Sequence, residues 1–236
     1  MSIYIISDLH LKAAEPEVFR QFSVFLQQIT NKGNTLYILG DFFEYWVGDD
    51  ANDTFYQRVI SLLKNATNCG LVIYFMHGNR DFLIGKTFAA NSGIQLIQDP
   101  YYLHWQNQLI ALMHGDLLCT DDQRYLRYRK VVQSRWFKWL FLHLPLALRN
   151  KMADKMRQKS KNRKRYEIEF DATDKGINRY AKDAQIIIHG HTHKLAIHKH
   201  HSKTRYVLGD WHKNQYSYIQ INDQITLYNS GVIEHA

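Results

Sequence analysis

The chain of 236 residues is poor in cysteine and proline, with two of the former and three of the latter. Cys69 and Cys119 stand in no Cys-x-x-Cys pattern, which argues against a thiolate-rich structural zinc site and is typical of a reducing compartment. No apolar run approaches the ~20 residues that span a bilayer. No basic and apolar leader precedes the first predicted strand, so we expect no signal peptide. These absences predict a cytoplasmic protein, either soluble or peripheral to a membrane.

What the chain does contain is ample material for a core, since 45% of its residues are hydrophobic and 14% are aromatic. Its length suits one sizeable core, or a core with an inserted subdomain. The net charge of +8 is unevenly spread, because residues 120–166 hold 15 Lys or Arg and only 3 Asp or Glu. We therefore predict a core of residues 1–119 and 184–236, with residues 120–183 as an inserted basic and apolar helical cap.

Apolar spacing predicts how the elements alternate. Residues 15–31 have helical periodicity, and a second helix is expected from about Asp53, with Thr54 and Gln57 spaced as a capping box. Strands and helices alternate up to about residue 100, which predicts a largely parallel α/β sheet. A hairpin is expected around residues 106–108. In the cap, helices over residues 122–160 should break near Pro145, and another helix should follow over residues 173–182.

Five predicted strands each end in a short polar loop with histidine, aspartate or asparagine, usually beside a glycine. In chain order the loops carry Asp8 and His10; Asp41; Asn79, Arg80 and Asp81; His114 and Asp116; and His191 and His193. Ligand sites of open α/β sheets form at the carboxyl ends of the strands. The His-x-His pair after the β-branched run of residues 186–188 is modest evidence by itself. Five such loops at one edge predict a site.

The donor types in these loops indicate a metal centre. The candidate ligands are Asp8, His10, Asp41, Asn79, His114, His191 and His193. Seven donors exceed the four to six that one transition ion takes, so two ions with a shared ligand are expected, and Asp41 is the predicted bridge. Imidazole, carboxylate and amide oxygen suit Mn, Fe or catalytic Zn, and donor types do not choose among them. Two ions ~3.5–4 Å apart can hold a hydroxide between them, which predicts in-line hydrolysis of a phosphoester or phosphoanhydride.

These motifs resemble those of the calcineurin-like metallophosphoesterases. The resemblance rests on Asp8-x-His10, Gly40-Asp41, Gly78-Asn79, His114-Gly115 and Gly190-His191-Thr-His193, in register over residues 3–193. It implies an α/β fold with a four-layer αββα sandwich. It also implies one metal site formed by Asp8, His10, Asp41 and His193, and a second formed by Asp41, Asn79, His114 and His191.

One position departs from the family pattern, which commonly has histidine after Gly-Asn as an aid to the leaving group. Here that position is Arg80. Arginine cannot act as a general acid near neutrality, but its planar guanidinium can grip phosphate oxygens through two hydrogen bonds. A phosphate leaving group needs no protonation, so the change favours a diphosphate substrate.

Residues 39–50, 78–82 and 114–122 resemble more narrowly the branch of the family that hydrolyses UDP-2,3-diacylglucosamine. The resemblance implies a diphosphatase of lipid A biosynthesis with two Mn²⁺ ions, working at the cytoplasmic face of the cell inner membrane. A hydroxide on the metals would attack the uridine-side phosphorus and release UMP and 2,3-diacylglucosamine 1-phosphate. The implied catalytic residues are Asp41, Asn79, Arg80 and His114. The implied substrate contacts are Asn79, Arg80, His114, Asp122, Ser160, Asn162, Lys164 and His191.

Other interpretations remain open from the sequence. The Trp/Phe/Leu stretch of residues 136–148, framed by Lys and Arg, has the composition of an interfacial helix, but it also fits an ordinary helical core under a charged surface. A basic aromatic segment beside two metals also fits a nuclease, although no nucleic-acid motif is present and no nucleic acid is expected. A non-catalytic scaffold would be expected to have lost ligands.

The acidic residues near the predicted ligands also have open roles. Glu44, Asp49 and Asp50 are either supports for the ligand imidazoles or plain loop charge. Asp81 and Asp116 are expected to orient His or Arg rather than bind metal.

Overall fold

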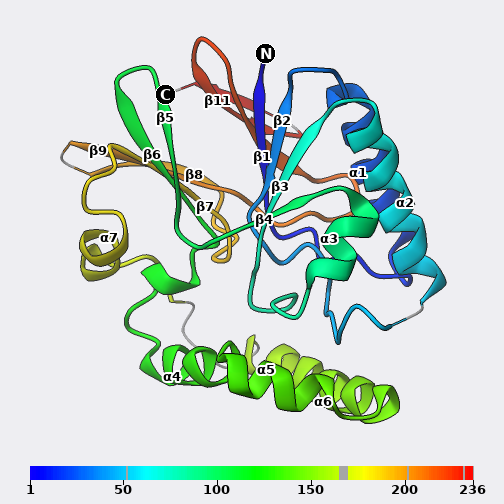
Figure 1. The fold of residues 1–236 in the computed structure, drawn as a ribbon. Coiled ribbons are helices and arrows are strands. Elements are labelled where there is room, and N and C mark those ends of the chain that lie inside the picture. The colour runs from blue at the N-terminus through cyan, green and yellow to red at the C-terminus, as the bar shows by residue number, and fades with distance from the viewer. Residues whose placement is uncertain (52, 165–169, 201, 231, 236) are drawn as a thin grey trace.

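The computed structural model describes residues 1–51, 53–164, 170–200, 202–230 and 232–235, and for residues 157, 159–164, 200 and 232–235 it describes the backbone alone. Its strands form two sheets that lie face to face (Figure 1). The first sheet has the order β12 (Val232–His235), β11 (Ile225–Asn229), β10 (Ser217–Ile221), β1 (Ile3–Ile6), β2 (Thr35–Ile38), β3 (Val72–Met76) and β4 (Gln95–Ile97). The second has the order β5 (Tyr101–Trp105), β6 (Gln108–Met113), β7 (Ile186–His189), β9 (Lys203–Val207) and β8 (Ala196–His200).

Helices cover the outer faces of both sheets. The first sheet is covered by α1 (Pro16–Ile29), α2 (Thr54–Asn68) and α3 (Lys86–Ser92), and the second by α7 (Asp174–Tyr180) (Figure 1). Three separate hydrophobic clusters fill the spaces between the four layers, one under each set of helices and one between the sheets. The predicted four-layer αββα sandwich is therefore confirmed.

Parallel pairing dominates where the sequence alternates strand and helix. Strands β1 to β4 pair in parallel in chain order, and β6, β7 and β9 are also parallel neighbours. Consecutive residues of β7 face different layers, because Ile186 and Ile188 pack between the sheets while Ile187 packs under α7. A strand buried on both faces has no polar alternation, which explains the continuous isoleucine run.

The first turns of the two long core helices, α1 and α2, contain residues that favour a helix N-terminus. Pro16 occupies the first turn of α1, where its missing N–H costs nothing. Helix α2 is capped by Asp53, whose carboxylate accepts hydrogen bonds from the backbone N–H groups of Phe55 and Tyr56. The predicted capping box of Thr54 and Gln57 is therefore wrong by one residue, because Asp53 is the extended residue before the helix and Thr54 is already its first helical residue.

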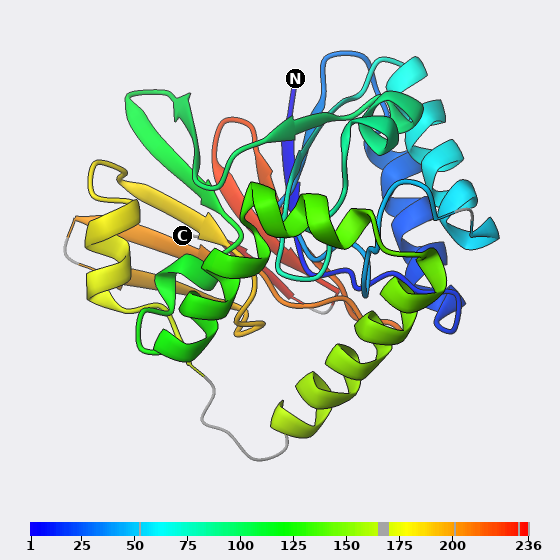
Figure 2. The ribbon, with the colours of Figure 1, turned by 60° about the horizontal axis from the view of Figure 1, so that its bottom comes forward.

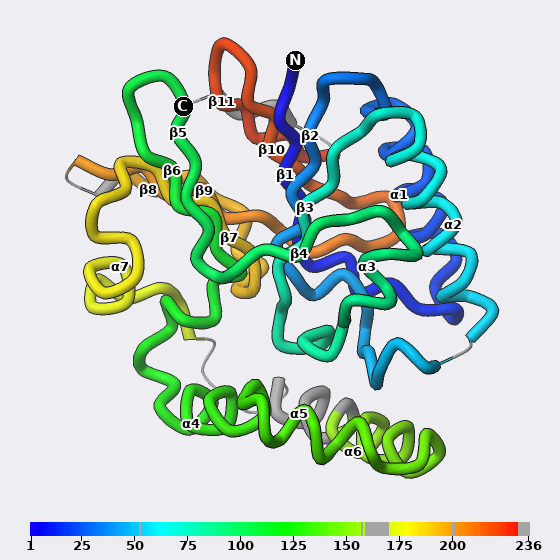
Figure 3. Tube along the Cα trace, viewed as in Figure 1, coloured from blue at the N-terminus to red at the C-terminus, as the bar shows by residue number. Residues whose placement is uncertain are grey.

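The cap consists of α4 (Gln123–Val132), α5 (Arg135–Leu142) and α6 (Leu146–Lys164), preceded by the short 3₁₀ helix of residues Asp116–Leu118. These three helices lie across the ends of both sheets (Figure 2), and the chain enters from β6 and returns to α7 beyond them (Figure 3). The break between α5 and α6 falls at Pro145, as predicted. Helix α7 was assigned to the cap from sequence, but Ile177 packs with Ala111 and Ile187 under the second sheet. It belongs with the core layers.

Candidate active site

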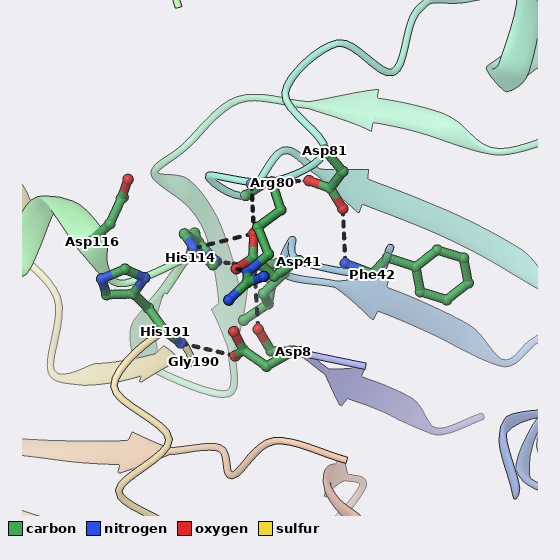
Figure 4. Close-up of polar contacts among 12 residues, drawn as sticks. Asp8, Asp41, Phe42, Arg80, Asp81, His114, Asp116, Gly190 and His191 are labelled. Atoms are coloured by element: carbon green, nitrogen blue, oxygen red, sulfur yellow. Dashed lines mark hydrogen bonds and ion pairs between the residues drawn. The ribbon is translucent and has the colours of Figure 1, made fainter. Parts of the chain in front are cut away.

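The five polar loops meet beneath the cap. Backbone hydrogen bonds tie them together: Asp8 N–H donates to Gly40 O at 3.1 Å, and Gly190 N–H donates to His114 O at 2.9 Å. The two sheets are joined directly, since the N–H of His191 donates to Asp8 Oδ2 at 2.8 Å (Figure 4). The expectation that strand ends from distant parts of the sequence converge is thus met by the geometry.

Two groups of candidate ligands share one carboxylate. Asp8, His10 and His193 offer donor atoms within 4.8 Å of one another, and so do Asp8, Asp41 and His114. Asp8 is common to both groups, whereas Asp41 lies with the second. The assignment of Asp41 as the bridging ligand therefore stays a prediction, and Asp8 is the residue placed between the two groups here.

Backbone strain is concentrated at these residues. Among the described non-glycine residues, seven have positive φ angles between 49° and 66°, and five of them are predicted ligands. Those five are Asp8, His10, Asp41, His191 and His193. A left-handed conformation costs L-residues free energy, so it persists where the surrounding structure imposes it, and such residues cluster at functional sites.

Close backbone approach explains two of the motif glycines. A Cβ on Gly78 would collide with the backbone and side chain of Asp41, and one on Gly190 would collide with Asp8 and Ser7. Any larger residue would push the loops apart and separate the donors. Gly78 therefore allows two loops of the first sheet to approach each other, and Gly190 allows the two sheets to bring their candidate ligands together.

Among the described residues, two predicted ligands, His114 and Asn79, each have a buried donor atom without a hydrogen-bond partner. His114 Nδ1–H donates to Leu39 O at 2.9 Å, which leaves Nε2 as the lone-pair donor in the neutral ring. That Nε2 is buried without a hydrogen-bond partner, and so is Oδ1 of Asn79. Buried polar atoms without partners are rare in native structures. Both atoms, with carboxylate oxygens beside them, fit a divalent cation.

Asp210 holds the last ligand of the set and was not among the predicted residues. Its Oδ2 lies 3.1 Å from Nδ1 of His193, so the ring presents Nε2 towards Asp8, 3.2 Å from Oδ1. Carboxylate partners of this kind fix the tautomer of a metal-binding histidine. A signal was present in the sequence, because Leu208-Gly209-Asp210 after β9 repeats the pattern of Leu39-Gly40-Asp41 after β2.

Arg80 lies at the metal carboxylates. Its Nη1 is 3.1 Å from Oε1 of the buried Glu44, and its Nε is 3.5 Å from Oδ2 of Asp41. Figure 4 shows the guanidinium lying over Asp41 beside Asp8 and His114. Glu44 therefore supports the arginine rather than an imidazole. The arrangement holds a positive charge beside the carboxylate of Asp41, one of the candidate metal ligands.

The other acidic residues of the loops have structural partners. Asp81 accepts hydrogen bonds from the N–H groups of Gly78 and Phe42 at 2.8 Å each, so it orients backbone rather than His or Arg (Figure 4). Asp116 does orient an arginine, since its Oδ2 accepts from Arg129 Nε and from the hydroxyl of Tyr125, both at 2.6 Å.

The loop carboxylates Asp49 and Asp50 hold chain segments and no ligand imidazole. Asp49 accepts from the N–H groups of Gly85 and Phe88 at the start of α3. Asp50 forms an ion pair with Arg149 of the cap. Asp122, a predicted substrate contact, accepts from the N–H of Tyr125 and caps α4. The predicted contacts Ser160, Asn162 and Lys164 lie on α6, and their side chains are outside the described part of the structure.

The buried carboxylates and imidazoles of the site shift one another's pKa values. Burial would raise the pKa of Asp8, but the His193 hydrogen bond and nearby imidazoles hold it well below its usual range. Burial would lower the pKa of His114, yet the carboxylates of Asp41, Asp116 and Asp8 raise it to about 9. For His193, the hydrogen bonds to Asp210 and Asp8 overcome burial and raise the pKa to about 9. Burial and the neighbouring His114 lower the pKa of His191 to about 3. Protons on His114 and His193 therefore supply positive charge where bound cations would otherwise supply it.

The family profile described as calcineurin-like phosphoesterase matches residues 1–195. The chain belongs to this family. A UDP-2,3-diacylglucosamine hydrolase of Haemophilus influenzae is 42% identical over 93% of this chain and 94% of its own length. One from Photorhabdus laumondii is 43% identical over 95% and 96%. Among solved structures, Vps29 from Entamoeba histolytica complexed with zinc matches at 16% identity and a TM-score of 0.46, covering 100% of this chain and 97% of that one.

Membership makes the chain a metal-dependent hydrolase of phosphoesters, and the site agrees with this. The candidate donors are oxygen and imidazole nitrogen, two of them are buried without a hydrogen-bond partner, and the two groups of candidate ligands share a carboxylate. Among the described residues, no helix combines the length and apolarity needed to cross a membrane.

Proposed function

We propose that this chain hydrolyses the diphosphate of UDP-2,3-diacylglucosamine, giving UMP and 2,3-diacylglucosamine 1-phosphate, a step of lipid A biosynthesis. The observation that carries the proposal is the set of relatives named for this hydrolysis, 40–43% identical over more than nine tenths of both chains. Arg80 at the metal carboxylates agrees with it. A cation that keeps its proton near neutral pH suits a phosphate leaving group, which departs without protonation.

The chain's own residues divide the work of the site. The proposed metal ligands are Asp8, His10, Asp41, Asn79, His114, His191 and His193. Two divalent ions bound there would supply a nucleophile from water at neutral pH and would stabilise charge on the phosphoryl group. Arg80, held by Glu44, binds diphosphate oxygens and offsets the charge that develops as the bond breaks. Asn79 and His114 lie at the same edge and orient the attacked phosphate.

Manganese is the proposed metal. The site has no thiolate, and its mixture of carboxylate, amide and imidazole suits a first-row ion of intermediate hardness. Asp8 between the two ligand groups supports a pair of ions with a shared carboxylate, and Asp41, with Oδ1 3.9 Å from His114 Nε2, is the second candidate for that role.

The cap supports a lipid substrate at a membrane. Trp136 and Trp139 of α5 are 67% and 60% exposed, while Phe137 and Phe141 on the other side of the helix pack toward the core. Monomeric soluble proteins seldom leave large apolar patches uncovered, and aromatic residues framed by Lys and Arg favour an interface with anionic lipid. We place the protein at the cytoplasmic face of the inner membrane, with the cap of α4, α5 and α6 towards the bilayer and the acyl chains.

Further substrate contacts are proposed at Asp122, His191, Ser160, Asn162 and Lys164. Of these, His191 lies beside His114, with ring centroids 5.0 Å apart, and Tyr125 of α4 faces it at 5.9 Å. Tyr125 of the cap therefore lies next to one of the proposed metal ligands. This juxtaposition would let one ligand touch both metal and cap.

The test is to strip the protein with a chelator, add UDP-2,3-diacylglucosamine in detergent with or without Mn²⁺, and assay UMP. The expected result is UMP formation only with metal. Absence of UMP, in a sample that hydrolyses a generic phosphodiester with Mn²⁺, would keep the metallophosphoesterase site and remove the lipid substrate.

A further inference from the structure

A basic recess lies between the cap and the outer layer of the second sheet, apart from the metal ligands. It has a volume of about 440 Å³ and is formed by one face of α4, the first turns of the chain after β6, and α7. Its lining residues are Leu117, Thr120, Gln123, Leu126, Arg127, Arg129, Lys130, Lys175, Arg179 and Tyr180. Five of these ten are cationic, and none is acidic.

Within the part of the chain that the structure describes, four of the five cations form no ion pair with a carboxylate. Arg129 is neutralised, with Nε 2.6 Å from Asp116 and Nη2 3.2 Å from Asp99. For Arg127, Lys130, Lys175 and Arg179, the described residues provide no ion pair. Like charges brought together by two separate helices repel one another, so the recess is stabilised by an anion that enters it.

The recess is also organised rather than a chance meeting of surface lysines. The hydroxyls of Thr120 and Thr173 form a hydrogen bond of 2.6 Å, which connects the start of α7 to the loop before α4. Gln123 donates to Thr120 O, and the Arg179 guanidinium rests 5.2 Å above the ring of Tyr180. Fixed arginines bind phosphate oxygens in a forked geometry, and flexible lysines add charge.

The surface beside the recess indicates which phosphate it receives. Val131 at the end of α4, next to Lys130 of the recess, is exposed, and α5 continues with exposed Trp136 and Trp139. Uncovered apolar side chains next to a multiply charged recess combine the two features that bind a bilayer surface, insertion and headgroup attraction. A soluble phosphate ester would need the cations but not the apolar surface.

We propose that this recess between α4 and α7 is a binding site for the phosphate headgroup of an anionic phospholipid, distinct from the metal site. It rests on the proposed function only in that both place the cap at a membrane. A headgroup held there would anchor α4, whose Arg129 and Tyr125 contact Asp116 beside the metal ligands.

The test compares vesicle binding by the full-length Lys175→Gln/Arg179→Gln variant with that of the wild type. These positions lie on α7, away from the proposed metal ligands. The matched control is Lys32→Gln/Lys213→Gln, which removes the same charge from exposed positions elsewhere. Binding is measured by co-flotation with phosphatidylcholine vesicles containing 20% or no phosphatidylglycerol. A cation near an anionic surface contributes about 1 kcal/mol, so the α7 variant should bind the anionic vesicles about 10- to 30-fold more weakly. The control should change by less than about twofold.

Equal losses in both variants would mean diffuse attraction and overturn the site, as would wild-type affinity in the α7 variant. Glycerol phosphate is added as a competitor at constant ionic strength. Its binding without any preference for anionic vesicles would overturn the lipid assignment. Hydrolysis is assayed separately in detergent, where the α7 variant should retain its activity. Failure of hydrolysis in the wild type would remove the proposed function and leave the vesicle result unaffected.

Discussion

At the scale of single residues, the environment of each ligand matters as much as its identity. Asp210 fixes His193 through Nδ1, as Leu39 O fixes His114. We expect Asp210→Asn to weaken metal binding about 10- to 100-fold, because the imidazole loses its orienting carboxylate. Metal affinity is measured by competition with a chromophoric chelator. His212→Ala, which removes the other partner of Asp210, is the control and should have little effect. Unchanged affinity in the Asp210 variant would show that the partner is only structural.

Arg80 acts on the substrate rather than on the metals. Arg80→His is expected to lower kcat about 100-fold or more while metal content by mass spectrometry stays at the wild-type value, because a transition-state charge partner is lost. Glu44→Gln should produce a smaller loss, since Arg80 keeps its charge but not its anchor. Metal loss in the arginine variant would contradict the assigned role.

Protons and metal ions compete for the same nitrogens. The pKa values of His114 and His193 are raised to about 9 in the metal-free protein, so both imidazoles carry a proton at pH 7.5. Coordination requires the neutral ring, so Mn²⁺ binding should release about two protons at that pH, and affinity should rise with pH until about 9. Calorimetric titrations in two buffers of different ionisation enthalpy measure the release. Equal heats in both buffers would rule it out.

At the scale of elements, a buried arginine of the cap binds the core. Arg149 of α6 is only 2% exposed and binds Asp50, Val47 O and Leu144 O. Arg149→Met should cost about 1–3 kcal/mol of local stability, because the carbonyls lose their donor. Hydrogen exchange should then accelerate in α5 and α6 and not in α1 or α2. Asp50→Asn should have a weaker effect, as both carbonyl contacts remain. Acceleration throughout the chain would mean that the cap and core unfold together.

At the scale of the whole molecule, charge and apolar exposure are concentrated at one end. Most of the exposed large apolar side chains among the described residues belong to the cap, from Tyr128 to Met156. Trp136→Ser/Trp139→Ser should therefore reduce partition onto vesicles roughly tenfold or more, through lost apolar burial at the interface. Turnover of detergent-dispersed substrate should be retained. Vesicle binding equal to that of the wild type would mean that α5 faces water.

The sequence by itself predicted the alternation of strands and helices and the loops that carry the candidate ligands, because strand periodicity and the Gly-Asp, Gly-Asn and Gly-His turns are local features. The four-layer arrangement followed only from the resemblance to a known family. The position of the basic segment and the break between its helices at Pro145 could also be predicted, because both depend on local sequence. Contacts between residues far apart in the chain could not be predicted from the sequence. The pairing of Asp210 with His193 joins residues on different loops. The packing of α7 against the second sheet depends on the side of the sheet to which the Ile187 side chain points. The carboxylate between the two ligand groups was likewise decided by tertiary structure, since Asp8 reaches both only when the sheets pack and Gly190 lets them approach.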